Sequence, residues 1–146
     1  MVNIKTGFLS ATMYVLFALP SICATESNIQ IVTSFTILED LARELSGEYV
    51  DVVNLVPRDS DAHVYLPKPS DSIAIANADL VITNGLGFEG WMVRLLEDAG
   101  KENKHLVASD GVRLLGENDE IDPHAWQSFH NIQIYVQNIS DMLIKL

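Results

Sequence analysis

The feature that most constrains the fold of this chain is the regular alternation of β-branched runs with segments of helical periodicity between residues 29 and 109. The run at 29–33 reads Ile-Gln-Ile-Val-Thr, and residues 35–46 then space their apolar side chains three and four positions apart until Gly47. Parallel strands need a crossover between them, so the alternation predicts an α/β lobe with a four-stranded parallel sheet flanked by helices. The expected strands are 29–33, 49–56, 79–83 and 105–109, and the expected helices are 35–46, 70–77 and 88–99.

Residues 1–24 have the pattern of a secretory signal peptide. Lys5 is their only charged residue, residues 7–19 are mostly apolar, and small residues lead up to Ala24. The apolar stretch is shorter than the ~20 residues that a membrane-spanning helix needs. We expect cleavage after Ala24 rather than a lipid anchor on Cys23, because the preceding Pro-Ser-Ile matches a lipidation signal poorly. The sequence therefore predicts a periplasmic protein.

The charge and cysteine content narrow the classes of partner. The formal net charge is −11, from 20 acidic and 9 basic residues. This balance argues against nucleic-acid binding, which depends on clustered Lys and Arg, and it is compatible with a surface that attracts cations. Cys23 is the single cysteine, so cleavage after Ala24 leaves a chain that can bind a metal only through nitrogen and oxygen donors.

Two histidines, each two positions after an aspartate, occur in loops of the expected fold. Asp61 and His63 follow the second expected strand, and Asp122 and His124 follow the fourth. The carboxyl ends of parallel strands share one rim of a sheet, so both imidazoles are expected at that rim. Imidazole is the commonest protein ligand for divalent transition metals. The sequence therefore predicts a metal site that contains His63 and His124.

The remaining polar residues are given supporting or ordinary roles. Asp61 and Asp122 either accept a hydrogen bond from the neighbouring imidazole or cap the backbone of their own loop, and the sequence favours neither use. His105 and His130 lack the Asp-x-His context, and we expect neither to bind metal.

Two further features of the rim follow from residue type alone. Phe88 and Trp126 are expected to form an apolar wall beside the histidines. Asn84 and Gly85 are expected to form a turn that permits close approach of the backbone, without binding metal themselves.

From Ser128 onward, apolar residues again recur every three or four positions, which predicts a helix up to Leu146. One interpretation is that this helix has lost its packing partner, exposes an apolar stripe and makes the chain associate. The alternative is a terminal helix that packs on its own lobe. The stripe consists of Ile132, Val136, Ile139, Leu143 and Leu146.

With the Asp122-Pro123-His124-Ala125-Trp126 motif and the Asp61-Ala62-His63 motif, the chain resembles the cluster A-I periplasmic solute-binding proteins of ABC metal importers. The resemblance covers the N-terminal half of that family, and Ala62 departs from the common Asp-Pro-His. It implies that His63 and His124 are ligands of a transported Zn²⁺ or Mn²⁺. The remaining ligands would come from a second lobe that this sequence lacks, which predicts weak binding by this chain alone.

The resemblance also implies a domain organisation and a partner. Residues 25–127 would be the N-terminal metal-binding lobe, and residues 128–146 would begin the helix that links it to the missing second lobe. This favours the interpretation of a truncated chain. The partner would be the ABC permease of the inner membrane, and the protein would not be an enzyme.

Two other functions remain open from the sequence. A metal-dependent hydrolase is disfavoured because no general base stands out and no His-Glu-x-x-His helix occurs. No sequence feature distinguishes an extracellular adhesion module of the same family from a transport protein.

The resemblance leaves the metal open between Zn²⁺ and Mn²⁺. The sequence lacks the His-rich loop that some zinc-specific members of the family carry, which slightly favours Mn²⁺ over Zn²⁺.

Overall fold

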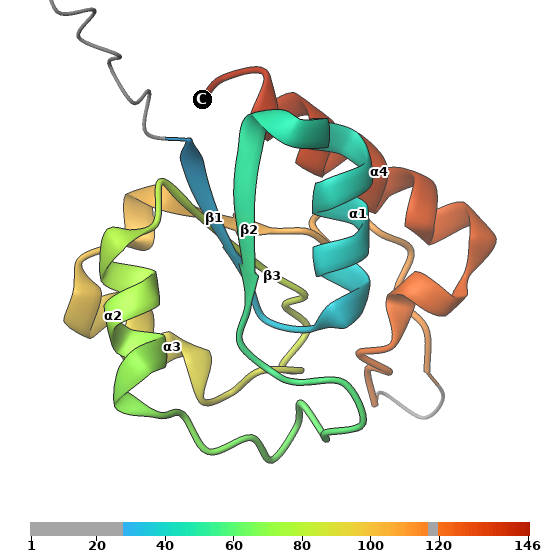
Figure 1. Ribbon diagram of the computed structural model, residues 1–146. Helices are drawn as coiled ribbons and strands as arrows, with labels where there is room; N and C mark the ends of the chain where they lie inside the picture. The colour runs from blue at the N-terminus through green and yellow to red at the C-terminus, as the bar shows by residue number, and fades with distance from the viewer. Residues whose placement is uncertain (1–27, 117–119) are drawn as a thin grey trace, which may run out of the picture.

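The computed structural model describes residues 28–116 and 120–146 (Figure 1). The expected signal peptide, residues 1–24 with Cys23, therefore lies outside the described residues. In the part of the chain that is described, no helix is both long and apolar enough to span a bilayer. The principal elements are β1 (Ile29–Thr33), α1 (Thr36–Ser46), β2 (Val50–Asn54), α2 (Pro69–Asn77), β3 (Leu80–Thr83), α3 (Met92–Ala99), β4 (His105–Val107) and α4 (Phe129–Leu143).

The four strands form one parallel sheet in the order β2-β1-β3-β4, which confirms the predicted α/β fold. In the register of the central strand β1, Ile29 lies opposite Val50 of β2, and Ile31 lies opposite Leu80 of β3. The chain thus adds β2 on one side of β1 and then crosses to add β3 on the other. Open α/β sheets bind ligands beyond the carboxyl ends of the strands where the winding reverses in this way.

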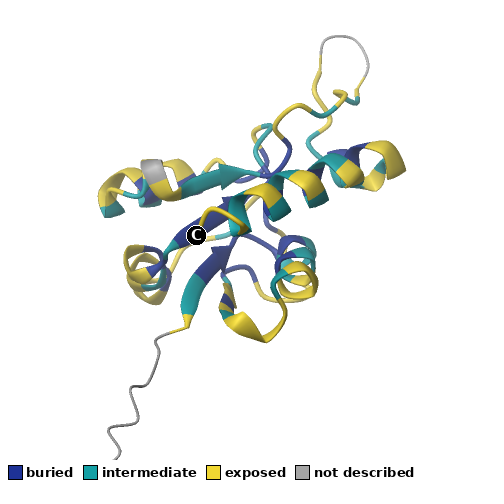
Figure 2. Cartoon of the chain, turned by 90° about the horizontal axis from the view of Figure 1, so that it is seen from above, coloured by how far each residue is buried: buried dark blue, intermediate teal, exposed yellow. Residues whose placement is uncertain are grey.

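Helices cover both faces of the sheet, α1 and α4 on one face and α2 and α3 on the other (Figure 1). Successive residues of a strand point to opposite faces, so β1 contributes Ile31 to the core beneath α1 and α4, and Val32 to the core beneath α2 and α3. Figure 2 shows the buried residues concentrated in the strands between the helices. Because β1 is buried on both faces, its carboxyl end is a rigid base for the loops beyond it.

The structure corrects the predicted start of α3, which begins at Met92 instead of Phe88. Residues 86–91 form turns. The Glu89 carboxylate accepts hydrogen bonds from the backbone N–H groups of Asn84 (2.7 Å) and Gly85 (3.2 Å). These bonds fold the connection back over the end of β3, which competes with a helical start.

Other predicted boundaries differ by one to three residues, among them the end of α4, which lies at Leu143 instead of Leu146. β2 and β4 are shorter than 49–56 and 105–109, although backbone hydrogen bonds continue as far as Val56 and Ser109. α2 begins at Pro69, ahead of the expected cap at residues 70 and 71. Asp71 lies inside the first turn, where its carboxylate accepts the backbone N–H of Lys68 at 2.7 Å.

The expectation that α4 exposes its apolar stripe is wrong. Ile139 is 0% exposed, and Ile132 and Leu143 pack against the core that α4 shares with α1. The alternative, a terminal helix that packs on its own lobe, is the one observed. The most exposed apolar residues of this segment are instead Phe129 at the start of α4 (82%) and Ile144 just after its end (83%).

Candidate metal centre

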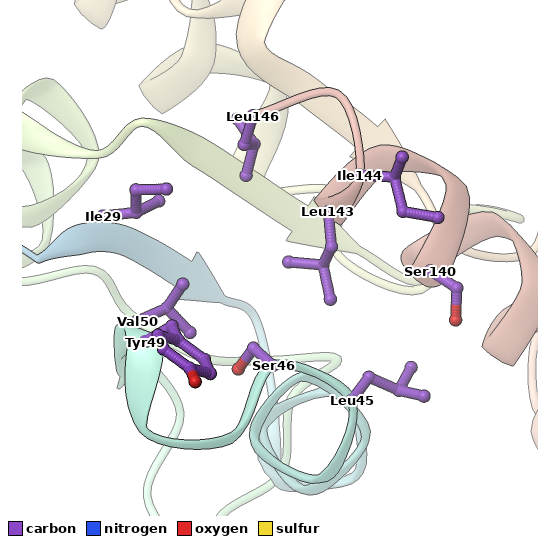
Figure 3. Close-up of a pocket in the computed structure, with 9 residues that line it drawn as sticks. All are labelled: Ile29, Leu45, Ser46, Tyr49, Val50, Ser140, Leu143, Ile144 and Leu146. Atoms are coloured by element: carbon purple, nitrogen blue, oxygen red, sulfur yellow. The ribbon is translucent and has the colours of Figure 1, made fainter.

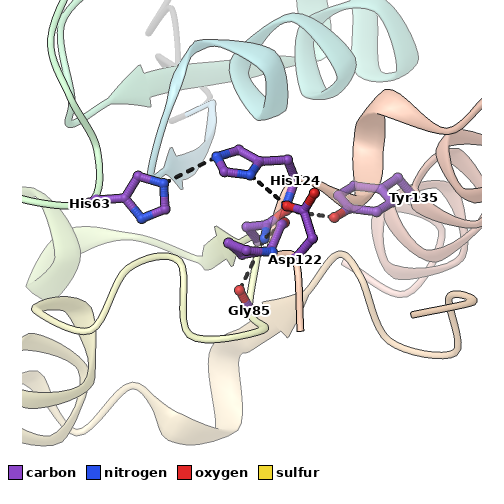
Figure 4. A network of polar contacts seen from close by, with 7 residues as sticks. His63, Gly85, Asp122, His124 and Tyr135 are labelled. Carbon is purple, nitrogen blue, oxygen red and sulfur yellow. Dashed lines mark hydrogen bonds and ion pairs between the residues drawn. The ribbon is translucent and has the colours of Figure 1, made fainter. Parts of the chain in front are cut away.

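His63 and His124 meet at the carboxyl end of the sheet although they are 61 residues apart in the sequence (Figure 4). His63 lies in the loop between β2 and α2, and His124 lies in the segment between β4 and α4. Their Nε2 atoms are 3.2 Å apart. Two nitrogens that each lie ~2.05 Å from one tetrahedral Zn²⁺ are separated by about 3.3 Å, so this spacing fits two ligands of a single ion.

The two aspartates turn out to have different contacts. Asp61 Oδ1 accepts the backbone N–H of His63 at 2.9 Å, which is the capping role. Asp122 Oδ1 accepts the backbone N–H of His124 at 2.9 Å and also lies 2.6 Å from Nδ1 of the ring. These two contacts, the backbone N–H first, lower the pKa of the Asp122 carboxyl. Because a carboxylate only accepts, Nδ1 carries the proton and Nε2 of His124 presents a lone pair.

Aromatic rings enclose the histidine pair on one side. The Phe88 ring centroid lies 4.4 Å from that of His63 and 5.0 Å from that of Trp126. Phe88 and Trp126 thus form the apolar wall that the sequence predicts. Phe35, which directly follows the β1 region, extends this wall with its ring 4.8 Å from Trp126. Sequence reasoning missed Phe35 because its apolar spacing assigned it only to a helix.

Each histidine follows a residue whose carbonyl is held by a distant side chain. The indole Nε1 of Trp91 donates to the carbonyl of Ala62 at 2.8 Å. The amide Nδ2 of Asn84 donates to the carbonyl of Pro123 at 2.9 Å. Sequence reasoning had given Asn84 only a turn, and it had placed Trp91 only within the helix expected over 88–99. The signal that could have found Asn84 is a polar residue at the end of an otherwise apolar central strand.

Gly85 is the second half of the expected turn, and its conformation matches that expectation. Its φ is +84°, and a Cβ there would lie 2.4 Å from Cγ1 of Val107. Only glycine therefore allows β3 and the end of β4 to approach this closely.

Glu89 is a buried carboxylate at the point where the sheet reverses its winding. It accepts the Ser34 hydroxyl at 2.5 Å in addition to the two backbone N–H groups beyond β3. Ser34 follows β1, so Glu89 joins the carboxyl ends of β1 and β3. Burial raises the pKa of Glu89, against the opposing effect of these hydrogen bonds. Its oxygens are occupied by protein donors, which makes it a structural tie between the two strands.

A cavity of about 260 Å³ opens beside the histidines and is lined mainly by the loop after β2 and by two aromatic rings. Asp59 and Asp61 contribute to its lining. Among residues 28–116 and 120–146, no group of three or more His, Cys, Asp or Glu side chains is arranged to hold a metal ion. Zinc sites in proteins normally have four ligands, so a pair of imidazoles could supply at most half of such a shell.

The other two histidines lie outside this pair. His105 Nε2 is 2.7 Å from the Thr83 hydroxyl, and partial burial lowers the pKa of His105. His130 is exposed on α4. Among the residues that the structure describes, neither has a carboxylate in contact with its ring as His124 has.

A larger groove of about 420 Å³ lies at the opposite, amino end of β1 and β2, against the end of α4 (Figure 3). None of the residues drawn there is a histidine or an acid, so this groove offers no metal site. Its lining consists of Ile29, Leu45, Ser46, Tyr49, Val50, Ser140, Leu143, Ile144 and Leu146.

Comparison with known proteins places these features in a family context. Residues 31–146 match the family described as "Zinc-uptake complex component A periplasmic" (ZnuA). The manganese-binding lipoprotein MntA of Halalkalibacterium halodurans is 40% identical over 118 residues, which cover 80% of this chain and 39% of that protein. The manganese ABC transporter substrate-binding lipoprotein PsaA of Streptococcus pneumoniae is 35% identical over 132 residues, which cover 83% of this chain and 43% of that protein.

A solved structure gives the same result for the fold. The Mn-bound periplasmic metal-binding protein from Candidatus Liberibacter asiaticus superposes with a TM-score of 0.73 at 34% identity, over 80% of this chain and 45% of that one. The chain thus spans less than half the length of these three proteins. MntA and PsaA are both called lipoproteins, which contradicts the expectation that a lipid anchor on Cys23 is absent.

Proposed function

Because this chain belongs to the ZnuA family of periplasmic zinc-uptake components, we propose that it captures a divalent transition metal as the substrate-binding component of an ABC importer. The relatives reported above are described as a manganese-binding lipoprotein and a manganese ABC transporter substrate-binding lipoprotein. The proposed mechanism is accordingly binding, delivery and release, with no covalent step.

The observation that carries the proposal is the facing pair of imidazole nitrogens, 3.2 Å apart. His63 and His124 would bind the ion through Nε2. Asp122 supports this role because it accepts a hydrogen bond from the N–H of His124 Nδ1, which leaves the lone pair of Nε2 free to coordinate. Asp61 supports it less directly, through the backbone of His63.

The proposed cargo is Zn²⁺ or Mn²⁺. The family description refers to zinc, whereas MntA and PsaA are described as manganese proteins. Two imidazoles favour zinc over manganese on affinity alone, so the oxygen ligands that complete the shell would decide between the metals. In this chain water would fill those positions, and we expect weak binding.

The proposed location and partner follow from the same family. The protein would act outside the cytoplasmic membrane and deliver its metal to the membrane permease. Residues 25–127 would form the metal-binding lobe, and 128–146 the start of a helix toward a second lobe; both assignments stay predictions.

Titration calorimetry with Zn²⁺ on the full chain tests the proposal. Wild type should bind weakly with one ion per chain, and the double variant His63→Ala/His124→Ala should lose that binding. The matched control is His130→Ala, which removes an exposed histidine and should bind as wild type does. Equal affinity in wild type and the double variant would overturn the assignment, as would equal losses in the double variant and the control.

A further inference from the structure

Two hydrogen bonds that meet at Asn84 join α4 to the loop that carries His124 (Figure 4). The Tyr135 hydroxyl on α4 donates to Asn84 Oδ1 at 2.6 Å. The Asn84 amide Nδ2 then donates to the Pro123 carbonyl at 2.9 Å, in a part-buried bond. Tyr135 and Asn84 are both 0% exposed. Water therefore does not compete for the bond between these two side chains, and each depends on its protein partner.

The chemistry of the partners allows the Asn84 amide one orientation. Its two N–H bonds point at the carbonyls of Pro123 (2.9 Å) and Gly85 (3.0 Å), and carbonyls only accept. The amide oxygen must then face Tyr135, whose hydroxyl supplies the proton. Burial raises the pKa of Tyr135, which keeps this hydroxyl protonated as a donor. Without this hydroxyl, the amide oxygen of Asn84 would have no hydrogen-bond donor on α4.

The bond to Pro123 acts directly on the histidine that follows it. The peptide plane between Pro123 and His124 is held at its carbonyl edge by Asn84 and at its N–H edge by Asp122 (2.9 Å). Fixing both edges of a peptide plane fixes the position of the next Cα, and the contact of Asp122 with Nδ1 then restricts the rotation of the His124 ring. Nε2 of His124 is thereby placed 3.2 Å from Nε2 of His63.

We infer that Tyr135 and Asn84 are positioning residues for the metal, an inference that rests on the proposed role of His124. They act through the Pro123 peptide and do not touch the ion. Through these bonds, the position of α4 against the sheet influences the distance between the Nε2 atoms of His63 and His124.

The variant Tyr135→Phe removes one hydroxyl and keeps the ring that fills the core. The matched control is Asn138→Ala, one turn along α4. It removes the hydrogen bonds from Asn138 to the carbonyls of Ala108 (2.9 Å) and Asp110 (2.8 Å) and leaves Asn84 untouched. Two measurements on the full chain are compared: the imidazole Cε1–H resonances of the metal-free protein, and Zn²⁺ affinity by calorimetry.

In Tyr135→Phe the His124 resonance should shift while that of His63 stays in place, and Zn²⁺ binding should weaken about fivefold, less than the ~10–100-fold typical of a direct partner of a ligand. In Asn138→Ala, stability should fall without either change. An unmoved His124 resonance in Tyr135→Phe would overturn the inference, as would an equal shift in the control. A shifted resonance in a protein that binds no Zn²⁺ would uphold the positioning and overturn the proposed function.

Discussion

The loops of His63 and His124 follow one plan but differ in how firmly each is held. Both use an aspartate two residues upstream to accept the histidine N–H at 2.9 Å. Both also have the preceding carbonyl held by a side chain from the segment after β3. In the His124 loop, however, the aspartate also contacts the ring, and the donor to the carbonyl is fully buried.

Under the proposed function, this difference would give the two histidines different parts in metal capture. His124 is oriented in advance in its ring tautomer, its peptide plane and its aromatic contacts. His63 has its backbone fixed, and its ring packs against Phe88 and His124. A pre-oriented ligand loses little conformational entropy on binding, so His124 would be the pre-oriented ligand and His63 the one that adjusts to the ion.

The largest expected effect tests the buried anchor. Asn84→Ala should lower the free energy of unfolding by about 3 kcal/mol, because it leaves the Tyr135 hydroxyl and the Pro123 carbonyl without partners in the interior. Urea denaturation measures this change. The control Asn77→Ala, at an exposed asparagine, should stay within about 0.5 kcal/mol of wild type. A loss below about 1 kcal/mol in Asn84→Ala would show that the His124 loop does not depend on its anchor.

The two aspartates give the next contrast. Asp122→Asn should weaken Zn²⁺ binding about tenfold, because it disturbs the acceptor that sets the ring tautomer of His124. Asp61→Asn should weaken it only about twofold, since Asp61 contacts the backbone and not the ring. Titration calorimetry measures the Zn²⁺ affinity of both variants. An equal loss of affinity in the two would contradict the proposed difference between the loops.

The anchor of the His63 loop should matter less for stability. Trp91→Phe removes the indole N–H that donates to the Ala62 carbonyl and keeps an aromatic ring against Tyr65. We expect a loss of about 1 kcal/mol in the free energy of unfolding, the usual net value of one hydrogen bond. The imidazole resonance of His63 should move and that of His124 should not; a shift confined to His124 would contradict separate support of the two loops.

The smallest effect concerns pH. The backbone N–H and ring of His124 lower the pKa of Asp122, so the folded state holds its proton less readily than the unfolded state. Stability from this contact is therefore present above the ordinary aspartate pKa and is lost as pH falls through the lowered value. A carboxyl ¹³C titration of Asp122 should give a midpoint below the ordinary range. That midpoint should rise in His124→Ala, and an unchanged midpoint would exclude the ring as a cause.

The fold and the histidine pair were accessible from the sequence because both depend on local patterns. A β-branched run followed by helical spacing identifies each strand–helix unit. Parallel strands bring their carboxyl ends to one rim, so the loops that carry His63 and His124 meet there although the two residues are far apart in the sequence. The different contacts of Asp61 and Asp122 could not be predicted from the sequence. Both aspartates stand two residues before a histidine, and their contacts differ only because the His124 ring is turned toward its aspartate.

The supporting contacts were missed because they join residues that are remote in sequence. Tyr135 and Asn84 are 51 positions apart, and no local pattern marks them as a pair. The packing of α4 was misjudged for the same reason: its apolar side chains meet a core shared with α1, near the other end of the described chain.

The strand order β2-β1-β3-β4 also has a consequence for the time at which the site can exist. The β1–β2 pair closes a short loop, whereas the β1–β3 pair brings together residues 49 positions apart, as the Gln30–Asp79 hydrogen bond shows. Long loops close more slowly than short ones. A newly made chain in which β1, α1 and β2 have docked has a His63 loop with neither its indole anchor nor its partner imidazole. Under the proposed function, metal capture would therefore require that this part of the chain has finished folding, and a half-folded chain would not hold metal through the histidine pair.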